Sequence, residues 1–147
     1  MSTTTAPNTT TETATSTVTR SFAVVRRTAW LVNALFWSAF AVLEGVNHGW
    51  LATLFAVAFF LAPDFTFLAG IGETRPMEKG QLPPRAVPFY NAAHRALVPL
   101  ALIVVYPFLP VIQWVPLFAG FCGWLAHISY DRAFGYGLRT KEGFQRA

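Results

Sequence analysis

The segment that decides the fold reads Trp124-Leu125-Ala126-His127-Ile128-Ser129-Tyr130-Asp131-Arg132-Ala133-Phe134-Gly135-Tyr136-Gly137-Leu138. It begins inside an apolar run and carries a histidine, an aspartate and an arginine where that run ends. Because His127 and Asp131 are four residues apart, a helix places their side chains on one face, one turn from each other. The segment therefore predicts a helix that holds ionisable groups at the boundary of an apolar environment.

The composition around this segment is that of a membrane protein. The 147 residues suffice for one domain; 54% of them are hydrophobic and only 12% are charged. A soluble domain carries about 25% charged residues. The single cysteine, Cys122, excludes a disulfide framework within one chain. The net charge of +4 is explained by membrane topology, because Lys and Arg gather in the cytoplasmic loops of membrane proteins. We therefore expect the lipid bilayer as the partner and no binding of nucleic acid.

Four apolar segments approach the ~20 residues that a helix needs to span a bilayer. They cover about residues 28–46, 50–70, 86–109 and 111–134. The preceding residues 1–22 are rich in Thr, Ser and Ala without apolar periodicity, which predicts a disordered tail. The expected fold is therefore all-α: a tail followed by a four-transmembrane-helix bundle over residues 23–147.

The basic residues predict the orientation of this bundle. Lys and Arg outside the apolar segments fall in the N-terminal flank, the middle loop and the C-terminal tail, and none falls in the two other turns. By the positive-inside rule, both termini of this multi-pass protein are expected in the cytoplasm. Ala119 and Gly123 form a small-residue pair on the last helix, which predicts close helix packing and a face for a homo-oligomer.

A polar cluster is expected near the cytoplasmic side. Counted at 1.5 Å per residue, polar groups from three helices reach the cytoplasmic half or rim of the bilayer. Asp64 and Arg95 are expected to form an ion pair, and His127 and Asp131 a hydrogen-bonded pair, because an unpaired charge in the membrane costs about 2.5–3.5 kcal/mol. The members of the cluster are Asp64, Asn91, His94, Arg95, His127, Asp131 and Arg132.

Three functions fit such a cluster. It can be structural or bind a small ligand. It can hold a divalent metal, Zn²⁺ or Mn²⁺, through Asp64, His94, His127 and Asp131, and so activate water against a lipid-like phosphate or ester. It can also relay protons or solutes. The spacing of the residues does not decide between these functions or show that the protein is an enzyme.

Three motifs carry a resemblance to a known family: Leu61-Ala62-Pro63-Asp64, Tyr90-Asn91-Ala92-Ala93-His94, and the long segment that ends at Leu138. With these motifs the chain resembles the domain-of-unknown-function family 4260, small bacterial membrane proteins, over roughly residues 33–144. The resemblance implies a four-helix membrane domain in the bacterial inner membrane and no assigned activity. Pro63-Asp64, His94-Arg95 and His127 with Asp131 also look like the motifs of membrane-embedded metal-dependent hydrolases.

Overall fold

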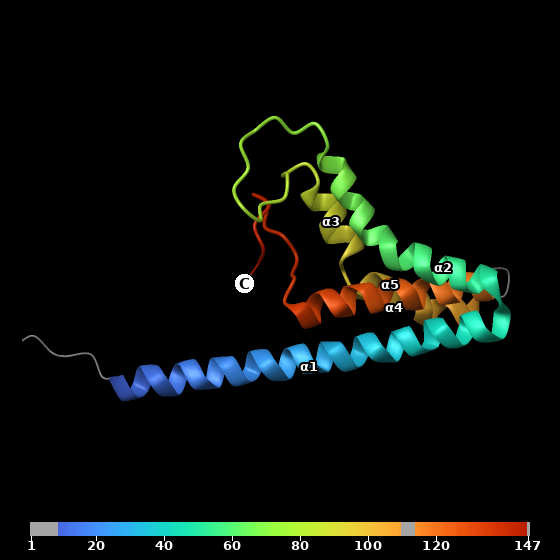
Figure 1. Ribbon diagram of the computed structural model, residues 1–147, viewed down its shortest axis with the longest axis horizontal. Coiled ribbons are helices and arrows are strands. Elements are labelled where there is room, and N and C mark those ends of the chain that lie inside the picture. The colour runs from blue at the N-terminus through green and yellow to red at the C-terminus, as the bar shows by residue number, and fades with distance from the viewer. Residues whose placement is uncertain (1–8, 110–113, 147) are drawn as a thin grey trace, which may run out of the picture.

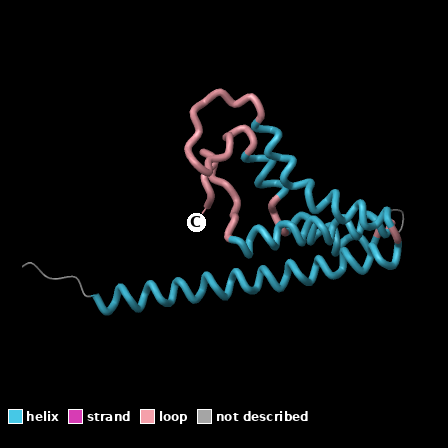
Figure 2. Tube along the Cα trace, in the orientation of Figure 1, coloured by secondary structure: helices cyan, strands magenta, loops and turns pink. Residues whose placement is uncertain are grey.

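The structure, a computed structural model, describes residues 9–109 and 114–146, and every regular element in these ranges is a helix (Figure 1, Figure 2). Short 3₁₀ helices, η1 and η2, directly continue two of the α-helices. The elements in chain order are α1 (Thr9–His48), α2 (Trp50–Leu61), η1 (Ala62–Gly70), α3 (Val87–Ala93), α4 (Leu97–Val105), η2 (Tyr106–Phe108) and α5 (Val115–Phe134). The predicted all-α class is thus confirmed for the described part of the chain.

Helix α5 is the centre of the fold, and it packs against α1, α2 and α4. Its residues are almost all buried from Ala119 to Ser129. A Cβ atom added to Gly123 would lie 2.2 Å from the backbone oxygen of Ala56, so the two helices touch through their backbones. The small-residue face of Ala119 and Gly123 is therefore covered by α2 of the same chain, and association between chains stays a prediction.

Helix α1 begins earlier than the composition predicts. Residues 9–22 are helical in the structure although they belong to the tail for which we expected disorder, and residues 1–8 of that tail lie outside the described residues. The physical reason is that helix nucleation is costly whereas propagation adds one hydrogen bond per residue. Once the apolar part of α1 packs on α5, the helix can extend towards its N-terminus at small cost.

The third apolar segment is a bent pair of helices, α3 and α4, at an angle of 43°. Pro99 accounts for the bend, because proline has no backbone N–H and its ring clashes with the carbonyl four residues earlier, that of Arg95. The Arg95 carbonyl instead accepts a hydrogen bond from the Val98 N–H at 2.9 Å. The break leaves His94 at the C-terminal end of α3.

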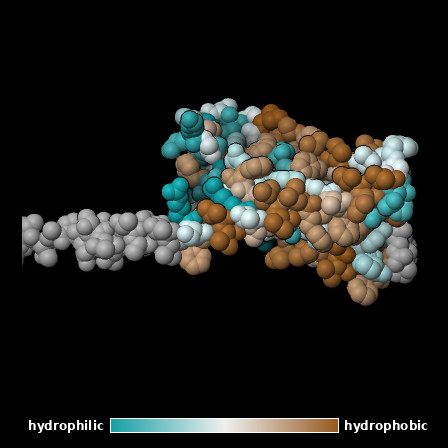
Figure 3. All heavy atoms as spheres, turned by 60° about the horizontal axis from the view of Figure 1, so that its bottom comes forward, coloured by the Kyte–Doolittle hydropathy of each residue, from teal (hydrophilic) through white to brown (hydrophobic). Residues whose placement is uncertain are grey.

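Two stretches of the described chain are long and apolar enough to cross a membrane, Thr19–His48 and Trp50–Gly70, and the bent pair makes up to three if it counts as one span. Helix α5 is not among them, since His127, Asp131 and Arg132 lower its hydropathy. Figure 3 shows apolar side chains over the helical body and polar side chains gathered towards the end from which α1 projects. These helices are compatible with the membrane protein that the composition predicts.

The C-terminal tail docks beside α3. Asn91 donates to the Arg139 carbonyl at 2.9 Å and accepts from the Arg139 N–H at 2.7 Å. The Leu82 N–H, in the loop between η1 and α3, donates to the Gly143 carbonyl at 3.0 Å. Gly143 adopts a φ of 99°, and a Cβ atom added to it would overlap the backbone of Leu82. The tail is thereby held against α3 and against the loop that precedes it.

Candidate metal centre

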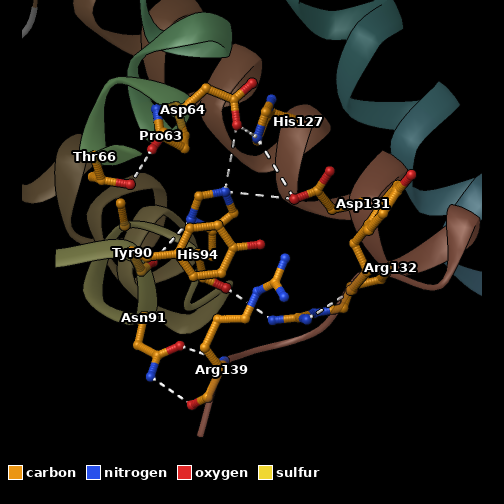
Figure 4. Close-up of polar contacts among 12 residues, drawn as sticks. Pro63, Asp64, Thr66, Tyr90, Asn91, His94, His127, Asp131, Arg132 and Arg139 are labelled. Atoms are coloured by element: carbon orange, nitrogen blue, oxygen red, sulfur yellow. Dashed lines mark hydrogen bonds and ion pairs between the residues drawn. The ribbon is translucent and has the colours of Figure 1, made fainter. Parts of the chain in front are cut away.

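Four side chains from three elements converge at one place (Figure 4). Asp64 lies in the first turn of η1, His94 ends α3, and His127 and Asp131 lie one turn apart on α5. The Nε2 atom of His94 is 3.9 Å from Asp64 Oδ1 and 3.5 Å from Asp131 Oδ2. The Nε2 atom of His127 is 3.6 Å and 3.8 Å from the same two oxygens. Both imidazoles therefore face the same pair of carboxylates.

Local structure sets the position of Asp64. Pro63 lies at the second position of η1, which directly continues α2. Its missing N–H removes the hydrogen bond that an α-helix would make to the Phe59 carbonyl, so the α-helical ladder ends here. The Thr66 hydroxyl donates to the Pro63 carbonyl at 2.6 Å and closes the turn. The change from α2 to the tighter η1 directs the Asp64 carboxylate towards the two histidines, while its side chain remains 52% exposed.

His94 is held in one orientation by Tyr90. Its Nδ1 lies 2.8 Å from the Tyr90 carbonyl, and because a carbonyl only accepts, Nδ1 carries the proton. The Tyr90 ring stacks on the imidazole with centroids 3.8 Å apart. His94 is 1% exposed, so its second nitrogen, Nε2, is buried and directed at the carboxylates. At metal sites, a histidine that binds the ion through one ring nitrogen commonly donates the N–H of its other ring nitrogen to a backbone carbonyl.

His127 is buried as well, and the Phe60 ring packs edge-on against it with centroids 5.3 Å apart. Among the residues that the structure describes, the Nε2 atoms of His94 and His127 are buried without any hydrogen-bond partner. Buried polar atoms are hydrogen-bonded in the great majority of cases. Two unpaired nitrogen atoms that face the same two carboxylates therefore need a physical explanation.

The nitrogen-to-oxygen distances are close to those around a small metal ion. A tetrahedral ion with ligands at about 2.0–2.2 Å has its ligand atoms roughly 3.3–3.6 Å apart. The four nitrogen-to-oxygen distances here run from 3.5 to 3.9 Å, and the two shortest fall within that range. One ligand atom each from Asp64, His94 and His127 lies within 4.8 Å of the other two, and this group could hold a metal ion.

The other members of the predicted cluster lie around the centre, not in it. Asn91 binds the C-terminal tail as described above. Arg132 donates to the carbonyls of His94 and Tyr136, both at 3.0 Å. Arg95 is exposed and lines a separate pocket with Thr66 and Trp124. The expected ion pair between Asp64 and Arg95 is therefore wrong: the helix break after His94 turns Arg95 away, and Asp64 faces the two histidines.

Residues that the sequence analysis did not assign also shape the site. Tyr90 was part of a quoted motif, and its four-residue spacing from His94 was the signal that could have revealed the stacking. The guanidinium of Arg139 lies 5.5 Å from the centre of the Tyr90 ring. Asn33 donates to the Ser129 hydroxyl at 2.7 Å and joins α1 to α5. No local pattern indicates the contacts of Arg139 and Asn33, because they depend on how distant segments pack.

The family comparison agrees with the resemblance seen in the sequence. The family described as "Domain of unknown function (DUF4260)" matches residues 23–147, and the chain belongs to this family. No curated protein and no solved structure matches the chain. Its class is thus a domain of unknown function whose apolar helices are compatible with a membrane protein.

Proposed function

We propose that this chain is a multi-pass membrane protein that binds one divalent transition metal ion, Zn²⁺ or Mn²⁺, through Asp64, His94, His127 and Asp131. The observation that carries the proposal is the pair of buried Nε2 atoms, from His94 and His127, which have no hydrogen-bond partner among the described residues. Two imidazole nitrogens and two carboxylate oxygens are a ligand set that suits these ions.

The alternative of a purely structural cluster fits the geometry less well. With its proton on Nδ1, neutral His94 presents a lone pair to carboxylate oxygens, which also carry lone pairs, so that arrangement is repulsive without a cation between them. Protonated imidazoles would donate hydrogen bonds, but N–H···O bonds are about 2.7–3.2 Å long. The nitrogen-to-oxygen distances of 3.5–3.9 Å are too long for such bonds, and the two shortest match the separation of ligand atoms around an ion.

The proposal includes four membrane spans with both termini in the cytoplasm. Helix α5 falls short of the apolarity of a lipid-facing helix, but α1, α2 and α4 pack around it, so its polar groups need not meet lipid. The distribution of Lys and Arg supports the orientation. The resemblance to small bacterial membrane proteins supports the bacterial inner membrane as the location.

A second function builds on the same centre: metal-dependent hydrolysis of a lipid-like phosphate or ester. The observation in its favour is that Asp64 is 52% exposed although both histidines are buried, so one side of the centre is accessible. A metal there would supply an activated water or polarise the bond that is broken. Hydrolysis that requires both histidines and the added metal would support this second function.

The test of metal binding is the metal content of the purified protein. The chain is isolated in detergent without chelator, supplied with Zn²⁺ or Mn²⁺, and its metal is counted by mass spectrometry beside His94→Ala and His127→Ala. The third histidine, His48, pairs with Glu44 at 3.3 Å at the C-terminal end of α1, so His48→Ala is a matched control. We expect about one metal per chain in the wild type and the control, and little in the two variants. A folded wild type without metal under either supplement overturns the proposal.

A further inference from the structure

A second group of charged side chains lies beside the metal centre and plays no part in it. A pocket of about 280 Å³ lies between α1, the C-terminal end of α5 and the C-terminal tail. Three arginines line it, Arg26 from α1, Arg132 from α5 and Arg146 from the tail, together with Trp30 and Tyr136. None of the lining residues is acidic. Segments far apart in the sequence therefore bring three positive charges to one cavity.

These charges have no anionic partner in the described part of the chain. Arg132 donates to two backbone carbonyls, and Arg146 donates from Nε to the Arg139 carbonyl at 3.0 Å. The Arg26 guanidinium makes neither a hydrogen bond nor an ion pair with any residue that the structure describes. Three like charges around one cavity repel each other, and an anion between them would relieve that repulsion.

The pocket lets a bound group approach the Arg132 guanidinium closely. The carbonyls of His94 and Tyr136 hold the Arg132 guanidinium in place, so its remaining N–H groups are oriented in advance. At Gly137 the chain passes close to the pocket: an added Cβ would lie 3.6 Å from Arg132 Nη1 and 3.3 Å from the Arg146 carbonyl. Any side chain at this position would narrow the pocket.

We propose that this pocket binds a phosphate group, presented by the headgroup of an anionic phospholipid. Guanidinium groups bind phosphate oxygens through paired, charge-assisted hydrogen bonds. Arg26 and Trp30 lie at the start of the apolar segment 28–46 of α1, and a tryptophan and an arginine at the end of an apolar segment lie at headgroup level. Free inorganic phosphate has the same binding chemistry, so the test separates the two sources. The proposal does not depend on a metal at the neighbouring centre.

The test is isothermal titration calorimetry in a neutral detergent at low salt, with three probes. These are short-chain phosphatidic acid, short-chain phosphatidylcholine and inorganic phosphate. The double variant Arg26→Gln/Arg146→Gln removes two lining charges. The matched control Arg20→Gln/Lys141→Gln removes two exposed charges from the same two segments but outside the pocket.

We expect saturable binding of phosphatidic acid, weakened on the order of tenfold or more for each arginine removed, and a change below about threefold in the control. His94→Ala should bind phosphatidic acid like the wild type, which separates this site from the metal centre. Equal affinity for phosphatidic acid and inorganic phosphate would overturn the lipid as the source. Absent binding, equal binding of phosphatidylcholine, or equal losses in both double variants would overturn the pocket.

Discussion

The imidazole rings of His94 and His127 lie with their centroids 5.4 Å apart at an angle of 62°, although they come from different helices. Each imidazole packs against an aromatic ring: Tyr90 stacks on His94, and Phe60 packs edge-on against His127. Their free nitrogens thus meet the same two carboxylates in a buried setting. This relationship makes the centre a place for a cation and gives rise to the first two predictions.

Removal of the Asp131 charge should weaken metal binding. Asp131→Asn keeps the size of the side chain but replaces a carboxylate ligand by an amide, and we expect metal affinity to fall on the order of tenfold or more. A competition titration with a chromogenic zinc chelator measures this change. Glu44→Gln, which alters the carboxylate paired with His48, serves as the control and should bind zinc like the wild type. Equal affinities for all three proteins would contradict a role for Asp131.

Acid should release the metal. Histidine binds a metal only with a neutral imidazole, so protons compete with the metal as the pH falls. We expect metal content to be full at about pH 7.5, to fall as the pH is lowered stepwise, and to return when the pH is raised. Dialysis at stepped pH followed by metal analysis checks the prediction, with circular dichroism to follow the helices. Occupancy that does not change over this range would argue against histidine ligands.

The contact between α2 and α5 should not tolerate a larger residue at Gly123. A Cβ there would lie 2.2 Å from the Ala56 carbonyl oxygen, and backbone cannot move aside without separating the helices. Overpacking of this kind costs about 1–3 kcal/mol. Gly120→Ala on the same helix meets only the Phe59 side chain, at 3.0 Å, and should cost less. Thermal unfolding in detergent compares the two variants, and a Gly123→Ala protein as stable as Gly120→Ala would refute the backbone contact.

The C-terminal tail should come loose when Asn91 is replaced by Ala. The change removes both hydrogen bonds to Arg139 and leaves its partly buried N–H unpaired, at a cost of about 1–3 kcal/mol, whereas its carbonyl keeps the hydrogen bond from Arg146 Nε. We expect trypsin to cut faster at Arg139 and Lys141 in the variant. Asn47→Ala, at an exposed position in the last turn of α1, is the control and should leave the cleavage rate unchanged. A variant cleaved no faster than the control would show that other contacts hold the tail.

Reporter fusions test the membrane topology. A reporter placed after His48 lies in a turn without Lys or Arg, and one placed after Lys79 lies in the basic loop between η1 and α3. The positive-inside rule predicts a periplasmic signal for the first and a cytoplasmic signal for the second. Signals from the same compartment would contradict the span Trp50–Gly70, which lies between His48 and Lys79.

Much of the helical structure could be predicted from the sequence, because apolarity and length are properties of a segment. The expected span 50–70 coincides with the candidate span Trp50–Gly70, although it consists of α2 and the tighter η1. His127 and Asp131 share a face because helical periodicity places them there. The bend after His94 was missed, since Pro99 acts on the carbonyl of a residue four positions earlier.

The sequence by itself determined the helical class, the family motifs and the set of ionisable groups that must avoid lipid. Only the tertiary structure decided which of these groups meet: Asp64 faces His94 and His127, while Arg95 lies outside the centre. The same holds for the three arginines around the phosphate pocket, which come from α1, α5 and the tail. The physical reason is that membrane insertion depends on the apolarity of each segment alone, whereas partnership between polar groups depends on the rotation and crossing of helices, which long-range packing sets.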